Sequence, residues 1–363
     1  MTDDVHWMRR ALALAEGGRY TAAPNPLVGC VLVRDGAVVG EGYHRRAGEG
    51  HAEVNALLEA GPRAGGATAY VTLEPCAHHG RTPPCAEALI GAGIARVVAA
   101  LQDPNPQVAG RGLARLREAG IAVECGLLAN EAAALNPGFI KRMQTGRPYV
   151  RVKMAQSLDG RSALADGASR WITGPAARAD VQRWRARSQA IVTGIGTVLA
   201  DDPQLTARLP DVITQPLRVV LDSGLNLPPT ARLLGEPGST LVATRSVDAQ
   251  RAGALAAAGA QLVTLPAAAG GIDLGALLDE LARRQCNEVL VEAGPRLAGA
   301  FLAAGLADEL IVYIAPHLLG HGARPVFELP PVLHMDARLD LEPLDVLSFG
   351  PDLRLRLRPT PRA

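Results

Sequence analysis

Apolar residues recur along the chain in two alternating patterns, one typical of helices and one typical of strands. Helical spacing over residues 3–17 ends at Gly17-Gly18, and two apolar runs at 28–34 and 37–42 flank Asp35-Gly36, which favours a β-hairpin. Further helices are predicted over 52–60, 85–91 and 112–120, and strands over 67–73, 96–101 and 121–125. Strands that alternate with helices after a hairpin predict a layered α/β domain.

A second alternating series begins after a cluster of helix breakers. Asn136-Pro137-Gly138 and residues 145–148 flank the basic pair Lys141-Arg142, and a strand over 149–155 follows. Strands are then expected at 190–193, 217–221, 240–243, 261–264, 288–291, 310–314, 344–349 and 353–357, with helices at 176–186, 249–258, 274–285 and 296–304. The pattern predicts two α/β domains, residues 1–146 and 147–363.

Composition narrows the class of protein. The 363 residues are 48% hydrophobic, which suffices for two cores, and their net charge is +1. The predicted domains carry 14 basic and 14 acidic residues, then 23 and 22, and aromatic residues make up only 3%. Neither a basic surface nor a set of stacking aromatics is therefore indicated, which argues against a polynucleotide partner.

The cysteines and the N-terminus indicate the compartment. Five cysteines are too few and too odd in number for a disulfide framework. The acidic start has no signal-peptide pattern, and no run of 18 apolar residues suggests a membrane span. We expect a protein of the reducing cytoplasm, in which cysteines near a histidine indicate a metal before a disulfide.

One constellation has the residue types of a catalytic zinc site. His51-Ala52-Glu53 precedes Pro75-Cys76 and Cys85, and one imidazole with two thiolates leaves the fourth zinc position for water. Glu53, two residues after His51, would open a helix beside the metal without binding it and would carry protons in a hydrolytic deamination. Cys85 follows two prolines at a predicted helix start, where the helix dipole favours a thiolate.

Two other interpretations share this motif. A nucleic-acid base deaminase with an appended binding module would use the same zinc chemistry. A structural zinc module that serves protein interactions would instead need a fourth ligand, for which His78 and His79 are candidates, and would leave Glu53 without a role. The nine-residue step between the cysteines departs from the generic deaminase spacing of Cys-x-x-Cys.

The second half contains weaker signals. Residues 288–299 combine a strand, a Gly294-Pro295 turn and a helix start, an arrangement that suits either a phosphate-bearing ligand or a tight turn. Lys153 is one of only two lysines among 37 basic residues. It lies in a predicted inner strand. There it could serve as a compact charge or as a group with an adjustable pKa, or it could simply extend its amine to solvent from the edge of a strand.

Five motifs together carry a resemblance to a known family. They are Pro24-Asn25-Pro26, Gly40-Glu41-Gly42-Tyr43-His44, His51-Ala52-Glu53, residues 72–85 with their long insert between the cysteines, and residues 102–106. The chain resembles, over nearly its whole length, the bifunctional deaminase/reductases of riboflavin biosynthesis. The resemblance implies a cytidine-deaminase-like three-layer N-terminal domain and a dihydrofolate-reductase-like α/β C-terminal domain. It also implies a small pyrimidine ribotide as substrate and, as the usual assembly, a homo-oligomer without nucleic acid or membrane.

The resemblance assigns the first site. His51, Cys76 and Cys85 would bind Zn²⁺, and Glu53 would donate and accept the proton. The reaction would be hydrolysis of 2,5-diamino-6-(5-phosphoribosylamino)pyrimidin-4-one to 5-amino-6-(5-phosphoribosylamino)uracil and ammonia. Four further residues would contact the substrate: Asn25, His44, His78 and Arg81.

The resemblance also implies a reductase site that uses NADPH to open the ribosyl group to ribityl. Cofactor contacts would come from Ala155, Trp171, Thr197, Asp201, Ser223, Gly294, Pro295, Arg296, Leu297, Ala298, Gly299 and Ala300. Substrate contacts would come from Ser169, Arg185, Leu205, Arg208 and Glu292, with Lys153 nearby. Lys153, Asp201 and Glu292 are all candidates for the group that protonates the ring oxygen.

Overall fold

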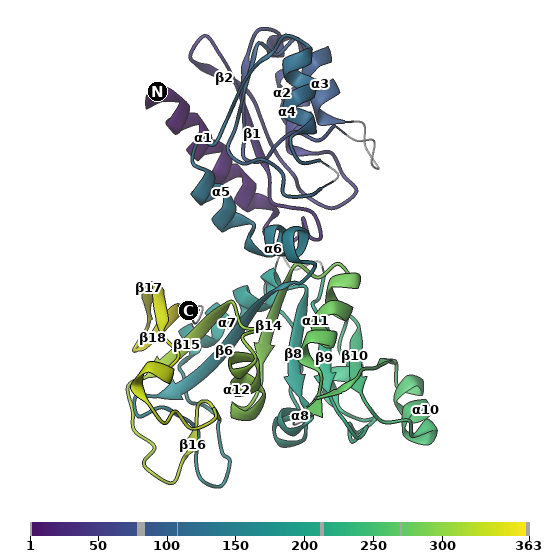
Figure 1. Ribbon diagram of the computed structural model, residues 1–363, viewed down its shortest axis with the longest axis vertical. Helices are drawn as coiled ribbons and strands as arrows, with labels where there is room; N and C mark the ends of the chain where they lie inside the picture. Colours follow the sequence, from purple (N-terminus) through teal and green to yellow (C-terminus); the bar gives the residue numbers. More distant parts are fainter. Residues whose placement is uncertain (1, 78–83, 107, 211–213, 269–270, 361–363) are drawn as a thin grey trace. The chain divides into compact units, whose positions relative to one another are not determined.

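The chain forms two compact units, Met1–Arg147 and Pro148–Ala363. The computed structural model describes residues 2–77, 84–106, 108–210, 214–268, 271–360. The boundary expected from the sequence lies one residue before this division. Each unit is built around its own mixed sheet (Figure 1).

The first unit is a three-layer α/β structure. Its sheet has the order β2-β1-β3-β4-β5, in which β1 is antiparallel to β2 and β3, and β3, β4 and β5 are parallel. The strands are β1 Gly29–Arg34, β2 Ala37–Tyr43, β3 Thr68–Val71, β4 Arg96–Ala99 and β5 Ala122–Cys125. The helices are α1 Thr2–Ala15, α2 Ala52–Ala60, α3 Cys85–Gly91, α4 Arg111–Glu118, α5 Ala129–Leu135 and α6 Pro137–Thr145, with short 3-10 turns at Glu16–Gly18 and Gly61–Ala64.

Alternation along β1 separates the two cores of this unit. Cys30 and Leu32 pack into the cluster that includes α2 and α3, whereas Val31 and Val33 pack with Met8 and other residues on the α1 side. Helices therefore cover both faces of the sheet, with α2, α3 and α4 on one side and α1 and α5 on the other (Figure 1). The fold class predicted for this unit is confirmed.

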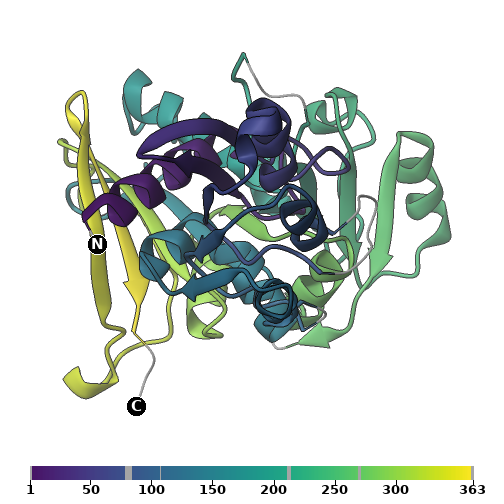
Figure 2. The same cartoon turned by 90° about the horizontal axis from the view of Figure 1, so that it is seen from above.

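The second unit is built on a nine-stranded sheet of order β11-β10-β9-β8-β14-β6-β15-β18-β17. All strands from the β11 edge of the sheet as far as β15 are parallel to one another. The strands β18 and β17 continue the sheet beyond β15 as an antiparallel hairpin. Figure 2 shows the hairpin and the β10–α10 region at opposite ends of the sheet. A long parallel sheet covered by helices is the α/β architecture that the alternating pattern predicted.

The elements of this unit follow the expected order. The strands are β6 Tyr149–Ser157, β7 Arg161–Ala163, β8 Ala190–Gly194, β9 Leu217–Leu221, β10 Thr240–Thr244, β11 Ala260–Thr264, β12 Ala267–Ala268, β13 Gly271–Ile272, β14 Glu288–Glu292, β15 Glu309–Ala315, β16 Arg324–Pro325, β17 Leu341–Phe349 and β18 Asp352–Pro359. The helices are α7 Pro175–Arg187, α8 Ile195–Asp201, α9 Arg232–Gly235, α10 Ala249–Ala257, α11 Leu274–Arg283 and α12 Pro295–Ala303, and a 3-10 turn spans Met335–Ala337.

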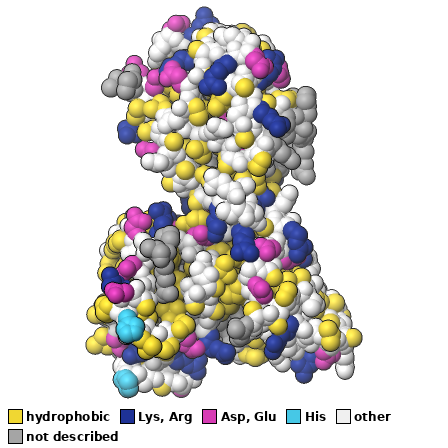
Figure 3. Space-filling view, in the orientation of Figure 1, with side chains coloured by type: hydrophobic (Ala, Val, Ile, Leu, Met, Phe, Trp, Pro, Cys, Tyr) yellow, Lys and Arg dark blue, Asp and Glu magenta, His cyan; other side chains and the backbone are white. Residues whose placement is uncertain are grey.

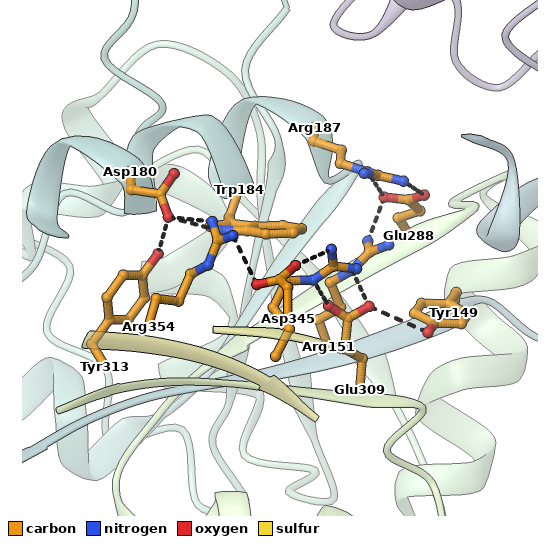
Figure 4. Close-up of polar contacts among 11 residues, drawn as sticks. Tyr149, Arg151, Asp180, Trp184, Arg187, Glu288, Glu309, Tyr313, Asp345 and Arg354 are labelled. Carbon is orange, nitrogen blue, oxygen red and sulfur yellow. Dashed lines mark hydrogen bonds and ion pairs between the residues drawn. The ribbon is translucent and has the colours of Figure 1, made fainter. Parts of the chain in front are cut away.

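Buried arginines form an ion network on one face of this sheet (Figure 4). Arg151 on β6, with a side chain only 1% exposed, binds Glu288 of β14 at 2.5 Å and Glu309 of β15 at 3.1 Å. Arg187 of α7 also binds Glu288, and Arg151 lies 5.3 Å from the ring of Trp184. The network ties α7 to three central strands, and its bidentate and stacked contacts favour arginine over lysine.

Two local features were missed or mispredicted from the sequence. The breaker-rich stretch before Gly146 contains the helices α5 and α6, and the Asn136 amide, between them, bonds to both the backbone N–H and the carbonyl of Leu27. Cys30 and Cys125 both lie in predicted strands, which favours buried thiols. Cys30 is buried, but Cys125 is exposed because β5 is an edge strand with much of its surface open to solvent.

None of the helices in the described ranges is long and apolar enough to cross a membrane.

Candidate active sites

Helix α2 begins at the first proposed metal ligand and packs unusually close to β2. A Cβ at Gly42 would lie 2.3 Å from the Ala52 carbonyl, and one at Gly40 would lie 2.3 Å from that of Ala56. Only glycine permits this approach, which explains the two glycines in the Gly40–His44 motif. His51 is the N-cap residue of α2, so Glu53 lies in the helix's first turn.

Three potential metal ligands converge at this helix start. The Nδ1 atom of His51 lies 3.2 Å from the Cys85 Sγ and 3.7 Å from the Cys76 Sγ, and the three donor atoms lie within 4.8 Å of one another. Donors around a tetrahedral zinc ion are separated by roughly 3.5 Å, given zinc bonds of ~2.0–2.3 Å. The donor set therefore fits zinc in both type and spacing.

Hydrogen bonds within this group of ligands favour ionisation of Cys76. The Cys76 thiolate accepts hydrogen bonds from the Cys85 thiol, the His51 ring and the Cys85 backbone N–H, which lowers the pKa of Cys76 to about 4. The same contact raises the pKa of Cys85. A divalent cation would replace the shared proton and allow both sulfurs to be thiolates.

Glu53 has the environment of a proton carrier. Its side chain is 3% exposed, and burial raises its pKa to about 7, against the opposing charge of His51. A carboxyl group with such a pKa holds and releases a proton near neutral pH. Glu53 also exchanges a hydrogen bond with Cys85, which places it beside the three ligands.

Two of the four residues expected to contact the first substrate lie next to this cluster. The Asn25 amide is 3.0 Å from His44 Nε2, and the rings of His44 and His51 meet edge to face with centroids 5.3 Å apart. His44 is buried and its pKa is lowered by desolvation, so it favours the neutral form. His78 and Arg81, and the alternative ligand His79, lie outside the described residues.

Glu74 is a functional candidate that the sequence analysis did not identify. It is 3% exposed, and its carboxylate accepts backbone hydrogen bonds from Asp103, Gly110, Gly112 and Leu113 at 2.8 to 3.3 Å. A Cβ at Gly112 would lie 1.8 Å from the Pro75 carbonyl. The segment that carries Cys76 is thus locked against residues 103–113. The sequence offered one signal for Glu74: it is a charged residue directly after the strand predicted over 67–73.

The second unit contains a cavity of about 1770 Å³ at the carboxyl ends of β6, β8, β9 and β14. Such crevices are the usual ligand sites of parallel sheets. Of the reductase residues expected from the sequence, all line this cavity except Ala298. Ala298 is fully buried in the core beneath α12.

Charged side chains gather where β14 ends beside the middle of β6. Glu292 and Lys153 are paired residues on these neighbouring strands, and Arg185 of α7 binds Glu292 through two contacts of 2.6 and 2.9 Å. Arg185 holds the pKa of Glu292 below its ordinary value, and burial lowers the pKa of Lys153. With Arg208 also facing this group, three cations surround one carboxylate and create a site for an anion.

The glycine turn lies in the same wall of the cavity. Gly294 is the N-cap of α12 and Pro295 its first residue, so backbone N–H groups of the first turn face the cavity. Gly299 has a packing role, because a Cβ there would lie 1.9 Å from the Glu328 carbonyl. Gly294 is therefore suited to a phosphate-binding turn, and Gly299 to close packing.

Further parts of the cavity lining come from the segment after β7 and from α8, whose Thr197 lies beside the Gly294 turn. Ser169, Trp171, Thr197 and Asp201 belong to this lining, and the Trp171 side chain is 68% exposed. Arg178 lies 4.4 Å from the Trp171 ring centroid, which holds the ring in place. Leu205, 3% exposed, adopts a left-handed conformation at φ 52°, a strained geometry that often accompanies ligand sites.

Comparisons with known proteins identify the family of each unit. A family model of the cytidine and deoxycytidylate deaminase zinc-binding region matches residues 1–101, and a model of the RibD C-terminal domain matches residues 148–355. Fold and sites together define a two-unit enzyme, a zinc deaminase joined to a reductase. The chain is 52% identical to the riboflavin biosynthesis protein RibD of Escherichia coli K12, over 98% of this chain and 99% of that protein. The chain belongs to the RibD family.

Solved structures extend this relation to the whole fold. RibD of Acinetobacter baumannii superposes with a TM-score of 0.93 at 49% identity, over 99% of both chains. A diaminohydroxyphosphoribosylaminopyrimidine deaminase/5-amino-6-(5-phosphoribosylamino)uracil reductase from Thermotoga maritima superposes with a TM-score of 0.88 at 33% identity, again over 99% of both chains.

Proposed function

We propose that this chain catalyses two consecutive steps of riboflavin biosynthesis. The first unit hydrolyses the 2-amino group of 2,5-diamino-6-(5-phosphoribosylamino)pyrimidin-4-one, and the second reduces the ribosyl group of the deaminated product to ribityl with NADPH. The observation that carries the proposal is the buried Glu53 beside three converging metal ligands, in a chain related to RibD over its full length. RibD proteins are the bifunctional deaminase/reductases of this pathway, and both units are present here.

His51, Cys76 and Cys85 would hold the zinc ion of the first site. Zinc with three protein ligands acts as a Lewis acid that makes water nucleophilic near neutral pH. Glu53 then accepts a proton from the attacking water and delivers it to the departing amino group, which leaves as ammonia. A group with a pKa of about 7 suits both transfers, because neither direction is strongly uphill.

Asn25 and His44 would orient the pyrimidine. Their contact of 3.0 Å and the burial of His44 fix an amide and a neutral imidazole beside the ligand cluster. Such groups supply both donors and acceptors to the edge of a heterocycle. His78 and Arg81 are proposed to complete the site, with Arg81 binding the ribose phosphate through its guanidinium fork.

In the second unit, the cation group at Glu292 would hold the deaminated ribotide. Arg185 and Arg208 supply the charge for its phosphate, and the Arg185–Glu292 pair fixes the orientation of both side chains. NADPH supplies the hydride for C1′, and the cavity walls at Trp171, Thr197 and the Gly294 turn would orient its rings and phosphates.

Among the three candidate proton donors of this step, the electrostatics favour Lys153. Glu292 is held in its ionised form by Arg185 and has no proton to give. Lys153 is a cation whose pKa is lowered by burial, so it releases a proton more readily than an ordinary lysine. Of these two groups, Lys153 is the better donor of a proton to the ring oxygen. Lys153→Met should abolish reduction and leave deamination intact.

Two further features of the proposal concern the state of the protein. The five cysteines, all within the described residues, form no disulfide bond, which suits the reducing cytoplasm. The hairpin β17–β18 ends the large sheet and exposes Leu341, Val346, Leu347 and Leu353, which suits pairing with a second copy. Sedimentation of the full chain should therefore give a homo-oligomer.

A polynucleotide substrate is not favoured. On the face shown in Figure 3, basic and acidic side chains are interspersed over both units, and no broad basic stripe crosses it. The near balance of charge in each half agrees with a single small phosphate held by a few local arginines.

Ammonia release tests the proposal. Zinc-loaded protein supplied with the diaminopyrimidinone ribotide and no NADPH should release one ammonia per substrate. Failure to release ammonia at any zinc loading would contradict the assignment.

A further inference from the structure

Helix α7 carries a buried carboxylate that neither proposed reaction uses. Asp180, 4% exposed, accepts hydrogen bonds from the Tyr313 hydroxyl of β15 at 2.6 Å and from the Arg354 guanidinium of β18 at 2.8 Å. The indole N–H of Trp184, one turn further along α7, also donates to it at 3.3 Å. One side chain thus joins the helix to two strands of the large sheet (Figure 4).

The side of α7 turned away from Asp180 lines the reductase cavity. Arg178, Gln182 and Arg185 line it at the i, i+4 and i+7 positions of one helix face. The Gln182 amide oxygen accepts the backbone N–H of Arg208 at 2.9 Å, and the Arg185 guanidinium binds the Glu292 carboxylate. The place of α7 on the sheet therefore determines where both proposed phosphate-binding arginines lie.

Trp184 adds a second attachment of the helix next to Arg185. Its ring is buried, and the guanidinium carbons of Arg151, Arg354 and Arg356 lie 5.3 to 5.5 Å from the ring centroid. Contacts between a cation and an aromatic face are more favourable where water is excluded. Because Trp184 directly precedes Arg185, this end of the helix holds the Arg185 backbone against the sheet.

Asp180 also reaches Lys153 through Tyr313. Tyr313 is fully buried, and the Lys153 Nζ lies 5.9 Å from its ring centroid. Burial and the bond to Asp180 raise the pKa of Tyr313, so its hydroxyl remains protonated and donates the hydrogen bond. The bond therefore holds the ring in one orientation beside the ammonium group of Lys153, a candidate proton donor of the reduction.

The other end of α7 is anchored separately. Asp352, 2% exposed, accepts the backbone N–H of Gly174, the N-cap of α7, at 2.6 Å. Near this end, Arg178 lies 4.4 Å from the Trp171 ring centroid. The Trp171 part of the cavity, which is proposed to bind the cofactor, thus depends on Asp352 rather than on Asp180.

We propose that Asp180 is a positioning residue of the reductase, which holds Arg185 and, through Tyr313, Lys153 in the arrangement that binds and reduces the ribotide. The inference rests on the proposed reduction in this cavity. Asp180 does not itself line the cavity and belongs to none of the motifs noted in the sequence. A displacement of a binding group by about 1 Å can cost a hundredfold in rate, even when the substituted residue is far from the chemistry.

The test is steady-state reduction of the deaminated ribotide by the zinc-loaded full chain. Asp180→Asn keeps the shape of the side chain and removes its charge. It should raise KM for the ribotide and lower kcat, so that kcat/KM falls by about tenfold to a hundredfold. KM for NADPH should stay within twofold of wild type, because Asp352 still holds the Trp171 end of the helix. Deamination by the first unit of the same chain should be unchanged.

Tyr313→Phe separates the two effects of Asp180. It removes the hydroxyl that bonds Asp180 and keeps the pair between Asp180 and Arg354, so α7 stays attached to the sheet. We expect kcat to fall by about threefold to tenfold, the range for one hydrogen bond, with KM for the ribotide within twofold of wild type. Because the ion pair is kept, this variant tests the inference even if Asp180→Asn does not fold.

Asp345→Asn is the matched control for loss of a charge in the same network. Asp345 on β17 binds Arg354 at 3.1 Å and Arg356 at 2.8 Å, and its side chain is 28% exposed. This substitution should lower the stability to urea and leave every reductase constant within twofold of wild type. Equal effects of Asp180→Asn and Asp345→Asn on the reduction would overturn the inference.

Three further results would also overturn the inference. They are a folded Asp180→Asn protein with the wild-type KM for the ribotide, a change confined to KM for NADPH, and a wild-type kcat in Tyr313→Phe. A wild-type protein that does not reduce the deaminated ribotide would instead contradict the proposed function itself. Wild-type turnover that Asp180→Asn and Tyr313→Phe leave unchanged would contradict only the role of Asp180.

Discussion

The proposed role of Glu53 requires its burial, which follows from its place in the first turn of α2. Solvent would return its pKa toward the ordinary 4.5, at which a carboxylate holds no proton near neutral pH. His51 begins the same helix, so one local structure would supply both a proposed ligand and the proposed proton carrier. The sequence could predict that these two residues lie together because a fixed spacing of two residues is enough to define the pair.

Substitution of Glu53 should separate metal binding from chemistry. Glu53→Gln keeps the shape of the side chain but cannot carry a proton, so deamination should fall by about a hundredfold or more. Zinc content, measured by metal analysis, should stay at one ion per chain. Glu118→Gln, at an exposed position on α4, is the matched control. Loss of zinc in Glu53→Gln would show that this carboxylate is a ligand.

At the scale of elements, the sequence predicted most of the strands and helices and missed those fixed by distant partners. Helices α5 and α6 follow from the bonds of Asn136 to Leu27, a contact over 109 residues that local spacing cannot reveal. The exposure of Cys125 depends on β5 being an edge strand, which is a property of sheet order. Glu74 likewise acts through backbone groups 29 to 39 residues away.

The close packing of α2 on β2 should control the zinc site. Gly42→Val would force a side chain to within 2.3 Å of the Ala52 carbonyl, and we expect destabilisation by about 3 kcal/mol and weaker zinc binding, because α2 begins at His51. Thermal unfolding and a competitive zinc titration measure the two effects. Gly91→Ala, which meets no atom within 4 Å, should change stability by less than about 1 kcal/mol. Wild-type zinc affinity in a folded Gly42→Val protein would contradict this coupling.

At the scale of the whole molecule, two units carry out separate chemistry and are stabilised differently. The first relies on apolar cores on both faces of its sheet, and the second adds the ion network around Arg151. Such a network makes the second unit sensitive to loss of a single charge, since an unpaired buried ion is costly. The excess of arginine over lysine in the sequence reflects partly the ion network around Arg151 and partly the proposed phosphate-binding arginines.

Acid should weaken the second unit through Glu288. Arg151 and Arg187 hold the pKa of this carboxyl at about 2, against an ordinary 4.5, so the folded protein binds its proton less tightly than the unfolded chain. The resulting stabilisation is fully present above pH 4.5 and is lost as the pH falls toward 2. Urea unfolding between these values should show the decline.

Removal of the same charge should have a comparable effect at neutral pH. Glu288→Gln should cost about 3–5 kcal/mol, because the buried Arg151 loses a partner. Glu342→Gln, at an exposed pair with Arg358, should cost less than about 1 kcal/mol. An acid-insensitive second unit, or equal effects of the two substitutions, would contradict the role given to the network.

The most direct test of two reactions in one chain is NADPH oxidation by zinc-loaded and zinc-depleted protein, with the diaminopyrimidinone ribotide as substrate. The zinc-loaded protein should oxidise NADPH only after ammonia appears. The zinc-depleted protein should oxidise none with this substrate and should reach the full rate when given the deaminated ribotide. NADPH oxidation from the aminated ribotide by zinc-depleted protein, or its absence with the deaminated ribotide, would contradict the account.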